Sequence, residues 1–239
     1  MTDEAYSDRQ SFIEGKVLLF DKPYKWTSFD VVGRIRSQLR RSLGIKKIKV
    51  GHAGTLDPLA TGLLIICTGK QTKSIDRYQG LDKTYTGTFF LGMTSASYDL
   101  ETSPENPRDT DHINRVLLEG IAGKLTGIQL QTPPLFSAKK IGGERAYMHA
   151  RKGLNTILSP NRIEIKEFDI TGIRLPEVDF RVVCSRGTYI RSLARDFGEL
   201  AGCGAYLSAL RRTHIGSYSV EAAISPEDFG GILKSPPSA

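Results

Sequence analysis

The chain is built around the stretch GHAGTLDPLATG, residues 51–62. Its three glycines allow turns that other residues resist, and Pro58 fixes φ directly after Asp57. Asp57 is the only carboxylate in the stretch, so it is held on a stiffened loop and is our candidate for chemistry. An Asp-Pro pair also commonly begins a helix, with Asp57 as N-cap and Pro58 as the first helical residue, and the dipeptide alone leaves this alternative open.

Length and composition limit the class of protein. The 239 residues, 39% of them hydrophobic, suit one large domain or a domain with a small insertion. The formal net charge of +7 fits a polyanionic partner, although such an excess can also serve solubility alone. Cys67, Cys184 and Cys203 form no Cys-x-x-Cys pair, which argues against a zinc site or a disulfide framework. Without a signal peptide or a membrane-length apolar run, we expect a cytoplasmic protein.

The segments before residue 51 predict a strand followed by a helix. Residues 16–20 are a short apolar run typical of a strand. From Thr27 a helix is predicted, because Asp30 completes a capping-box-like start and Gly44 provides a stop. The polar face of this helix and the loop beyond it carry a basic cluster, which either binds phosphate or is simply solvated: Arg34, Arg36, Arg40, Arg41, Lys46, Lys47 and Lys49.

The segments after residue 62 predict more strands than helices. Residues 63–68 fit a buried strand or a short helix, and residues 83–91 fit a strand that places Tyr85 on its apolar face, where packing is the commoner role. Two alternating segments predict a largely antiparallel sheet, and a later amphipathic segment predicts a helix with Arg191 in its first turn. The segments concerned are residues 94–108 (a polar loop), 162–174 and 177–184 (strands), 188–200 (a helix) and 206–212 (a final basic element ending in Arg211 and Arg212).

Four motifs, in this order along the chain, resemble those of the TruB family, the bacterial tRNA pseudouridine-55 synthases. They are Leu18-Leu19-Phe20-Asp21-Lys22-Pro23, the stretch around Asp57, Lys83-Thr84-Tyr85 and Gly187-Thr188-Tyr189-Ile190-Arg191. The resemblance implies a pseudouridine synthase fold of α+β class, with a mixed, mostly antiparallel central sheet flanked by helices and loops. We expect the catalytic domain at residues 15–230, with an RNA-contacting loop and insertion at 94–160, a mobile leader at 1–14 and a disordered tail at 231–239.

The resemblance also implies roles for individual residues. Asp57 would be the nucleophile, Tyr85 would stack on the target base and mediate proton transfer, and Arg191 would pair with Asp57 and keep it ionised. No metal or cofactor is implied, since the isomerisation involves no redox change. Whether Asp57 attacks C1′ of the sugar or C6 of the base, or acts through a glycal, stays open. Substrate contacts are implied for His52, Tyr189, Leu210, Lys22, Lys139 and Arg151.

Two departures from the family pattern concern RNA binding. The loop at residues 94–108 keeps Asp99, but it has Ala96 and Ser97 where Asp or Thr is common, and Thr102 in place of glycine. The residues after 218 are too few for the C-terminal PUA domain of many members, so we expect a monomer whose catalytic domain alone binds the T arm of tRNA. A noncatalytic RNA-binding or tRNA-folding protein is the alternative, and a glycosidase would need a second carboxylic acid beside Asp57.

Overall fold

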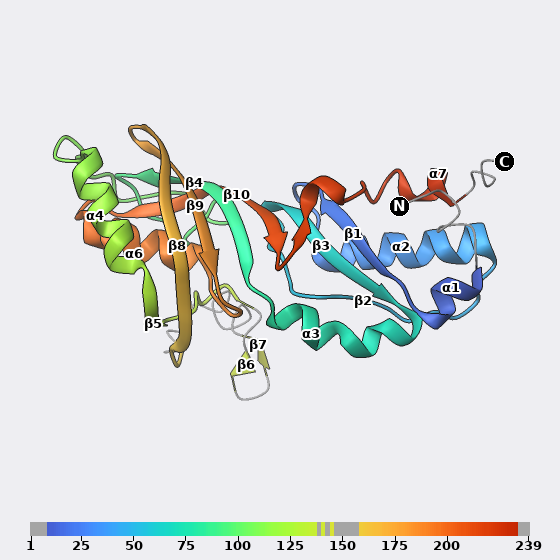
Figure 1. The fold of residues 1–239 in the computed structure, drawn as a ribbon. Coiled ribbons are helices and arrows are strands. Elements are labelled where there is room, and N and C mark those ends of the chain that lie inside the picture. The colour runs from blue at the N-terminus through green and yellow to red at the C-terminus, as the bar shows by residue number, and fades with distance from the viewer. Residues whose placement is uncertain (1–8, 138–139, 142–143, 146–157, 234–239) are drawn as a thin grey trace. The chain divides into compact units, whose positions relative to one another are not determined.

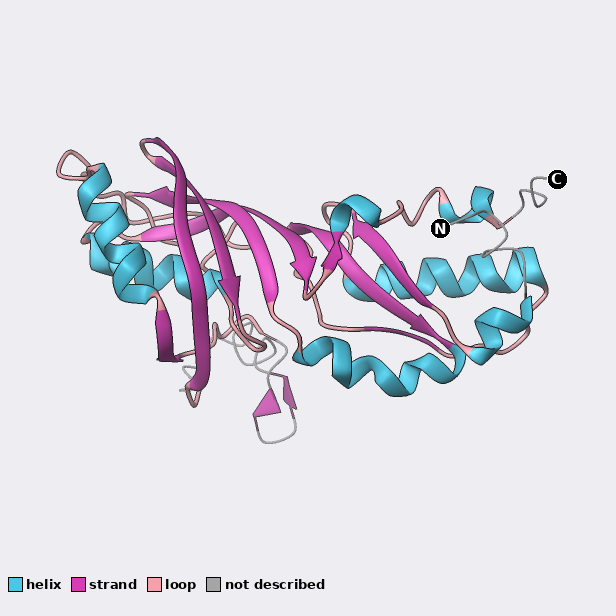
Figure 2. Ribbon diagram, in the orientation of Figure 1, coloured by secondary structure: helices cyan, strands magenta, loops and turns pink. Residues whose placement is uncertain are grey.

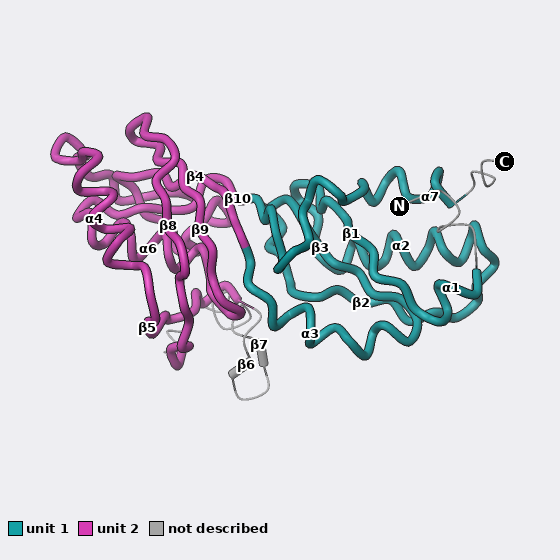
Figure 3. Tube along the Cα trace, in the orientation of Figure 1, with its two compact units in different colours: residues 1–83, 211–239 teal, residues 84–210 magenta. Residues whose placement is uncertain are grey.

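The computed structural model describes residues 9–137, 140–141, 144–145 and 158–233 (Figure 1). The expected catalytic domain consists of two compact units, residues 1–83 with 211–239 (unit 1) and residues 84–210 (unit 2) (Figure 3). Both units combine helices with strands (Figure 2), and the strand pairs with a described register are antiparallel. The α+β class with a mostly antiparallel sheet is therefore confirmed.

Unit 1 is built around strand β3 (Ala60–Thr68), which is buried along nearly its whole length. Because β3 finds partners on both edges, residues 63–68 form the buried strand and not the short helix. Its neighbours are β1 (Val17–Lys22) and β2 (Val50–His52), both antiparallel to it, and the C-terminal part of β10 (Ala205–Ile215), which also pairs with β11 (Tyr218–Ser219).

Helix α2 (Ser28–Leu43) packs on one face of this sheet, as the sequence predicts. Thr27 and Asp30 form a complete capping box, and Gly44 ends the helix with a left-handed φ of 61°. The buried side of α2 joins β1 and β3 in one apolar cluster, which includes Val31, Ile35, Leu39, Phe20 and Leu64. The opposite face of the sheet is covered by a second apolar cluster, in which Leu63 and Ile65 of β3 pack with Tyr78 of helix α3 (Ile75–Gly80). Helix α3 follows the 3-10 turn η2 (Gly69–Ser74).

Both ends of unit 1 correct the expected boundaries. Residues 9–14 form helix α1 (Arg9–Glu14) and are not a mobile leader, because the Phe12 ring is fully buried and packs edge to face on Phe229 at 6.2 Å. Helix α7 (Phe229–Ile232), which follows the 3-10 turn η3 (Val220–Ala222), continues into buried Leu233, so residues 231–233 belong to the core. The remainder of the expected leader and tail, residues 1–8 and 234–239, lies outside the described residues.

Unit 2 has a sheet in which the N-terminal part of β10 is followed in order by β4, β9, β8 and β5. The Phe89 ring stacks on Phe180 at 4.1 Å, and Phe168 and Phe197 complete an aromatic core. Within the described ranges no helix is long and apolar enough to cross a bilayer. The elements of unit 2 are β4 (Lys83–Leu91), α4 (Arg115–Leu125), β5 (Gly127–Gln131), β6 (Lys140–Ile141), β7 (Glu144–Arg145), β8 (Asn161–Arg174), β9 (Glu177–Cys184) and α6 (Ile190–Ala201).

Candidate active site

Asp57 lies on the loop that connects β2 to β3 in unit 1. Pro58 and Leu59 form a turn, and the Ala60 N–H that opens β3 donates to the Asp57 carbonyl at 3.1 Å. The segment enters a strand directly, so Asp57 is not the N-cap of a helix. Its side chain is partly exposed, as a group that must reach a substrate requires.

Ser28, the first residue of α2, fixes the residue before Asp57. Its hydroxyl accepts a hydrogen bond from the Leu56 N–H at 2.9 Å and lies 3.2 Å from the Leu56 carbonyl, to which it donates. The Leu56 side chain is itself buried. The start of the helix therefore holds the loop immediately next to the candidate nucleophile.

Arg212 on β10 holds the beginning of the same loop from inside the protein. Its side chain is 1% exposed, and Nε donates to the Leu63 carbonyl at 2.7 Å. The two terminal nitrogens reach the carbonyls of Thr55 at 3.4 Å and Gly54 at 3.3 Å. The strands approach closely here, because a Cβ on Gly62 would lie 2.2 Å from the Arg212 carbonyl oxygen.

The neighbouring Arg211 behaves as a surface residue. Its guanidinium is 40% exposed and pairs with Asp21 at 2.6 Å. Of the two arginines in the expected basic element at residues 206–212, only Arg211 can therefore meet solvent. The other is an internal anchor of the Asp57 loop.

Lys22 is a second buried cation below this loop. Its side chain is fully buried, and Nζ donates to the carbonyls of Pro23 at 3.0 Å, Trp26 at 2.6 Å and Pro58 at 3.3 Å. Burial lowers the pKa of Lys22 to about 8, against the attraction of Asp57, which raises it. With its donors engaged by carbonyls, Lys22 positions the loop and does not have the exposed ammonium expected of a direct RNA contact.

His52, at the end of β2, is half-buried beside the loop. Burial lowers the pKa of its imidazole, so the ring is neutral at neutral pH. Its ring meets Phe29 edge to face at 5.5 Å, and Phe29 is 67% exposed. Among the described residues, Nδ1 of His52 has no hydrogen-bond partner. A neutral imidazole and an exposed aromatic ring thus lie next to each other on unit 1.

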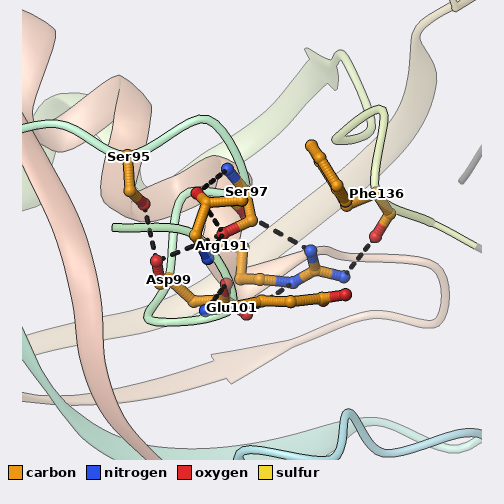
Figure 4. Close-up of polar contacts among 7 residues, drawn as sticks. Ser95, Ser97, Asp99, Glu101, Phe136 and Arg191 are labelled. Atoms are coloured by element: carbon orange, nitrogen blue, oxygen red, sulfur yellow. Dashed lines mark hydrogen bonds and ion pairs between the residues drawn. The ribbon is translucent and has the colours of Figure 1, made fainter. Parts of the chain in front are cut away.

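Arg191, on the first turn of α6 in unit 2, is buried among groups from two loops (Figure 4). Its terminal nitrogens donate to the carbonyls of Phe136 at 2.9 Å and Ser97 at 3.3 Å. Nε lies 3.6 Å from Oδ2 of Asp99, and both side chains are less than 10% exposed. Asp99 is therefore a buried counter-charge for Arg191, and the sequence had marked it only as a matching loop position.

The unusual residues of this loop compensate for each other. The Ser97 N–H donates to the Thr102 hydroxyl at 3.0 Å, and the Thr102 N–H donates to the Ser97 hydroxyl at 3.1 Å. The Ser97 hydroxyl also donates to the Asp99 carbonyl at 3.2 Å, as does that of Ser95 at 2.6 Å (Figure 4). These bonds close the loop around Asp99 with Thr102 at the position where the resemblance implies a glycine.

The other expected site residues are distributed over unit 2. Tyr85 is buried on β4, on the apolar face that the sequence predicts, and Leu210 is buried on β10. Tyr189 is the N-cap of α6, with its backbone bonded in both directions to the Gln131 amide. Lys139 and Arg151 lie outside the described residues. Because Asp57 belongs to unit 1 and Arg191 to unit 2, their ion pair stays a prediction.

Comparison with known families gives two matches along the chain. The model of the TruB family pseudouridylate synthase N-terminal domain matches residues 40–190, and that of the tRNA pseudouridylate synthase B C-terminal domain matches residues 191–234. The chain belongs to the TruB family. Two TruB relatives named tRNA pseudouridine synthase B, from Flavobacterium johnsoniae and Phocaeicola vulgatus, are 54% and 52% identical to it. The matches cover 90% and 92% of this chain and 94% and 93% of the relatives.

Solved structures confirm that the TruB chain has the pseudouridine synthase fold. A Cbf5-Nop10-Gar1 complex matches with a TM-score of 0.68 at 25% identity, over 97% of this chain and 56% of that one. An H/ACA ribonucleoprotein bound to a substrate RNA containing 2′-deoxyuridine matches with a TM-score of 0.67 at 23% identity, over 96% and 57% of the two chains. This TruB chain thus spans little more than half the length of those proteins.

Sequence reasoning missed the residues that hold the TruB-family loop in place. The sequence analysis does not single out Ser28, and it places Arg212 only in a final basic element. The carbonyl partners of Arg212 lie about 150 residues away in the chain and have no signature in the sequence.

Proposed function

We propose that this enzyme converts uridine to pseudouridine at position 55 in the T loop of tRNA, with Asp57 as the nucleophile. The high identity to relatives named tRNA pseudouridine synthase B supports the reaction and its substrate class. The observation that carries the assignment of Asp57 is its loop, in which a partly exposed carboxylate stands on a backbone held by Ser28, Lys22 and Arg212. Such restraint suits a group that must meet one atom of a substrate.

The reaction exchanges one bond to the sugar for another. The bond between N1 of the base and C1′ breaks, C5 of the base bonds to C1′, C5 loses a proton and N1 gains one, so no electrons are gained or lost. A carboxylate suits this exchange because it can attack carbon and later leave again. Asp57 would act on C1′ or C6, or through a glycal, and each route gives the same atom balance.

The partner roles rest on the resemblance and on the state of each side chain. Arg191 would serve as the cation of Asp57, and its guanidinium is already fixed by two carbonyls and by Asp99. Tyr85 would stack on the base and mediate proton transfer. Because the target base must leave its stack, which costs a few kcal/mol, aromatic contacts have to offset that cost. His52 with Phe29 offers one such surface on unit 1.

The enzyme is proposed to act as a cytoplasmic monomer on the T arm, without metal or cofactor. Its three cysteines are free and buried, which fits a reducing compartment. Sedimentation of the free protein and of its tRNA complex would measure the number of chains. Activity lost on treatment with a chelator, and regained with a metal ion, would contradict the metal-free reaction.

The test of this function is to incubate the protein with an unmodified tRNA transcript and to map pseudouridine by position. We expect a single product at position 55 with the wild type, and no turnover with Asp57→Asn or Asp57→Ala although both bind the tRNA. The matched control is Asp76→Asn on the exposed side of α3, which should retain activity. Multiple turnover by Asp57→Ala would refute the role of the nucleophile, and product at another position would refute the T-loop assignment.

A further inference from the structure

Unit 1 carries one surface on which positive charge is concentrated. We call it the basic face, and every one of its side chains is exposed: Arg34, Arg36, Arg40, Arg41, Lys46, Lys47 and Lys49. Residues 34–49 contain no Asp or Glu, so the seven cations equal the formal net charge of the whole chain, +7. The charge excess of this protein therefore resides largely in one segment.

Two hollows in the surface of α2 are lined by this face. One, of about 540 Å³, lies between Gly33, Ser37 and the guanidinium-bearing residues Arg36, Arg40 and Arg41. The other, of about 260 Å³, has Arg34 and Arg41 on one side and α7 with Glu227 on the other. Gly33 has open space where a side chain would stand, which leaves the first hollow accessible.

Among the described residues, these arginines lack the acidic partners that several other arginines have. Arg115, Arg174, Arg181, Arg195 and Arg211 each pair with a carboxylate. Among the described residues, by contrast, no carboxylate lies within ion-pair distance of Arg34, Arg40 or Arg41, and Arg36 donates only to the Val50 carbonyl. Such a concentration of like charge destabilises the fold by self-repulsion, which a bound polyanion would relieve.

The composition of the face distinguishes among polyanionic partners. Every residue between positions 33 and 49 that is classed as exposed is Arg, Lys or Gly. A membrane-surface helix would also present large apolar residues there, and a protein interface would have an apolar or aromatic centre. The absence of exposed aromatic rings also excludes base stacking at this segment, so the chemistry fits phosphate groups alone.

We propose that the basic face binds the phosphate backbone of the substrate tRNA, away from the nucleotide that reacts. This rests on the proposed function for the identity of the RNA. The face supplies sequence-independent affinity through release of counterions, while the Asp57 loop acts on the base. Arg40 and Arg41 are the central pair, because both line the larger hollow and Arg41 also lines the smaller one.

The experiment measures tRNA binding by Arg40→Gln/Arg41→Gln over a range of salt concentrations. Loss of two phosphate contacts should reduce the slope of log K against log salt by about 1.4–1.8, and raise Kd about tenfold or more at 0.1 M salt. The loss should appear in KM and Kd and not in the rate at saturating tRNA. Arg40→Lys/Arg41→Lys keeps both charges and should keep most of the slope, which a merely structural role of the arginines would not predict.

The matched control removes two exposed cations from a helix of unit 2, in Arg115→Gln/Lys124→Gln. A slope and Kd of the Arg40→Gln/Arg41→Gln protein equal to those of this control would overturn the proposal. So would unchanged tRNA affinity combined with loss of binding to phosphatidylserine vesicles, which would assign the face to a membrane. The wild-type product map, obtained on the same tRNA, tests the proposed function separately, because an enzyme that forms no pseudouridine can still show the binding difference.

Discussion

Replacing Arg212 by Met tests whether the buried guanidinium positions the Asp57 loop. Methionine fills a similar volume but leaves the carbonyls of Leu63, Thr55 and Gly54 without their donor. The bond of 2.7 Å to Leu63 is charge-assisted and worth about 1.5–3 kcal/mol, and the two longer bonds to partly buried carbonyls add less. The free energy of unfolding should fall by about 3 kcal/mol overall, which lowers the Tm by about 6–12 °C for a protein of this size.

Activity should fall by more than stability explains. A loop displaced by about 1 Å can cost a factor of a hundred, so we expect a ten- to hundredfold lower single-turnover rate, measured well below the Tm with enzyme in excess over tRNA. Arg212→Lys keeps the charge without the planar fork of donors, so its single-turnover rate should lie between those of the wild type and Arg212→Met.

Arg211→Met is the matched control for Arg212→Met, one residue earlier on β10. Its surface pair with Asp21 contributes at most about 1 kcal/mol and should leave the single-turnover rate within a few-fold of wild type. A wild-type rate in Arg212→Met, or a loss of Tm no larger than that of Arg211→Met, would show that this guanidinium does not position the loop.

Two further predictions concern buried charges. Asp99→Asn removes the counter-charge of Arg191, so we expect a stability loss of about 2–4 kcal/mol and at least a tenfold lower turnover rate. The control Glu101→Gln changes an exposed carboxylate and should match wild type. Equal turnover rates for both variants would contradict the role of Asp99. Lys22 has a folded pKa of about 8, below its ordinary value of 10.5, so between these pH values the unfolded chain holds a proton that the folded protein has lost. The contribution of Lys22 to the free energy of unfolding should therefore rise with pH, by up to about 3 kcal/mol, and urea unfolding of Lys22→Met should lack this rise. Parallel profiles from pH 7.5 to 10.5 would argue against the lowered pKa.

The elements predicted correctly are those whose signals are local. Helix α2 carries its own capping box and its own left-handed glycine, so the eighteen consecutive residues from Thr27 to Gly44 suffice to place both ends. Strand β4 likewise shows its buried face by alternation alone. Helix α1 has only six residues and is stabilised by the contact of Phe12 with Phe229, which no local pattern reveals.

The sequence predicts the chemical group of the candidate site, but it does not predict the buried residues that hold the Asp57 loop. Asp57 is recognisable because glycine, proline and a lone carboxylate occur together. Whether Asp57-Pro58 begins a helix or forms a turn depends on the pairing of β3 with its neighbours, which is a tertiary interaction. The resemblance implies a substrate contact for Lys22, and the sequence places Arg212 in a basic element. Both side chains are buried and stabilised by backbone carbonyls, which is rare for charged residues.

The reciprocal hydrogen bonds between Ser97 and Thr102 limit how this loop can change over time. Each residue supplies the acceptor for the backbone N–H of the other, so exchanging one alone leaves a donor and a hydroxyl unmatched. A chimera that imports glycine at position 102 from a relative, while it keeps Ser97, should lose the closure around Asp99. We therefore expect the two positions to be inherited together, so that recombination that separates them should be selected against.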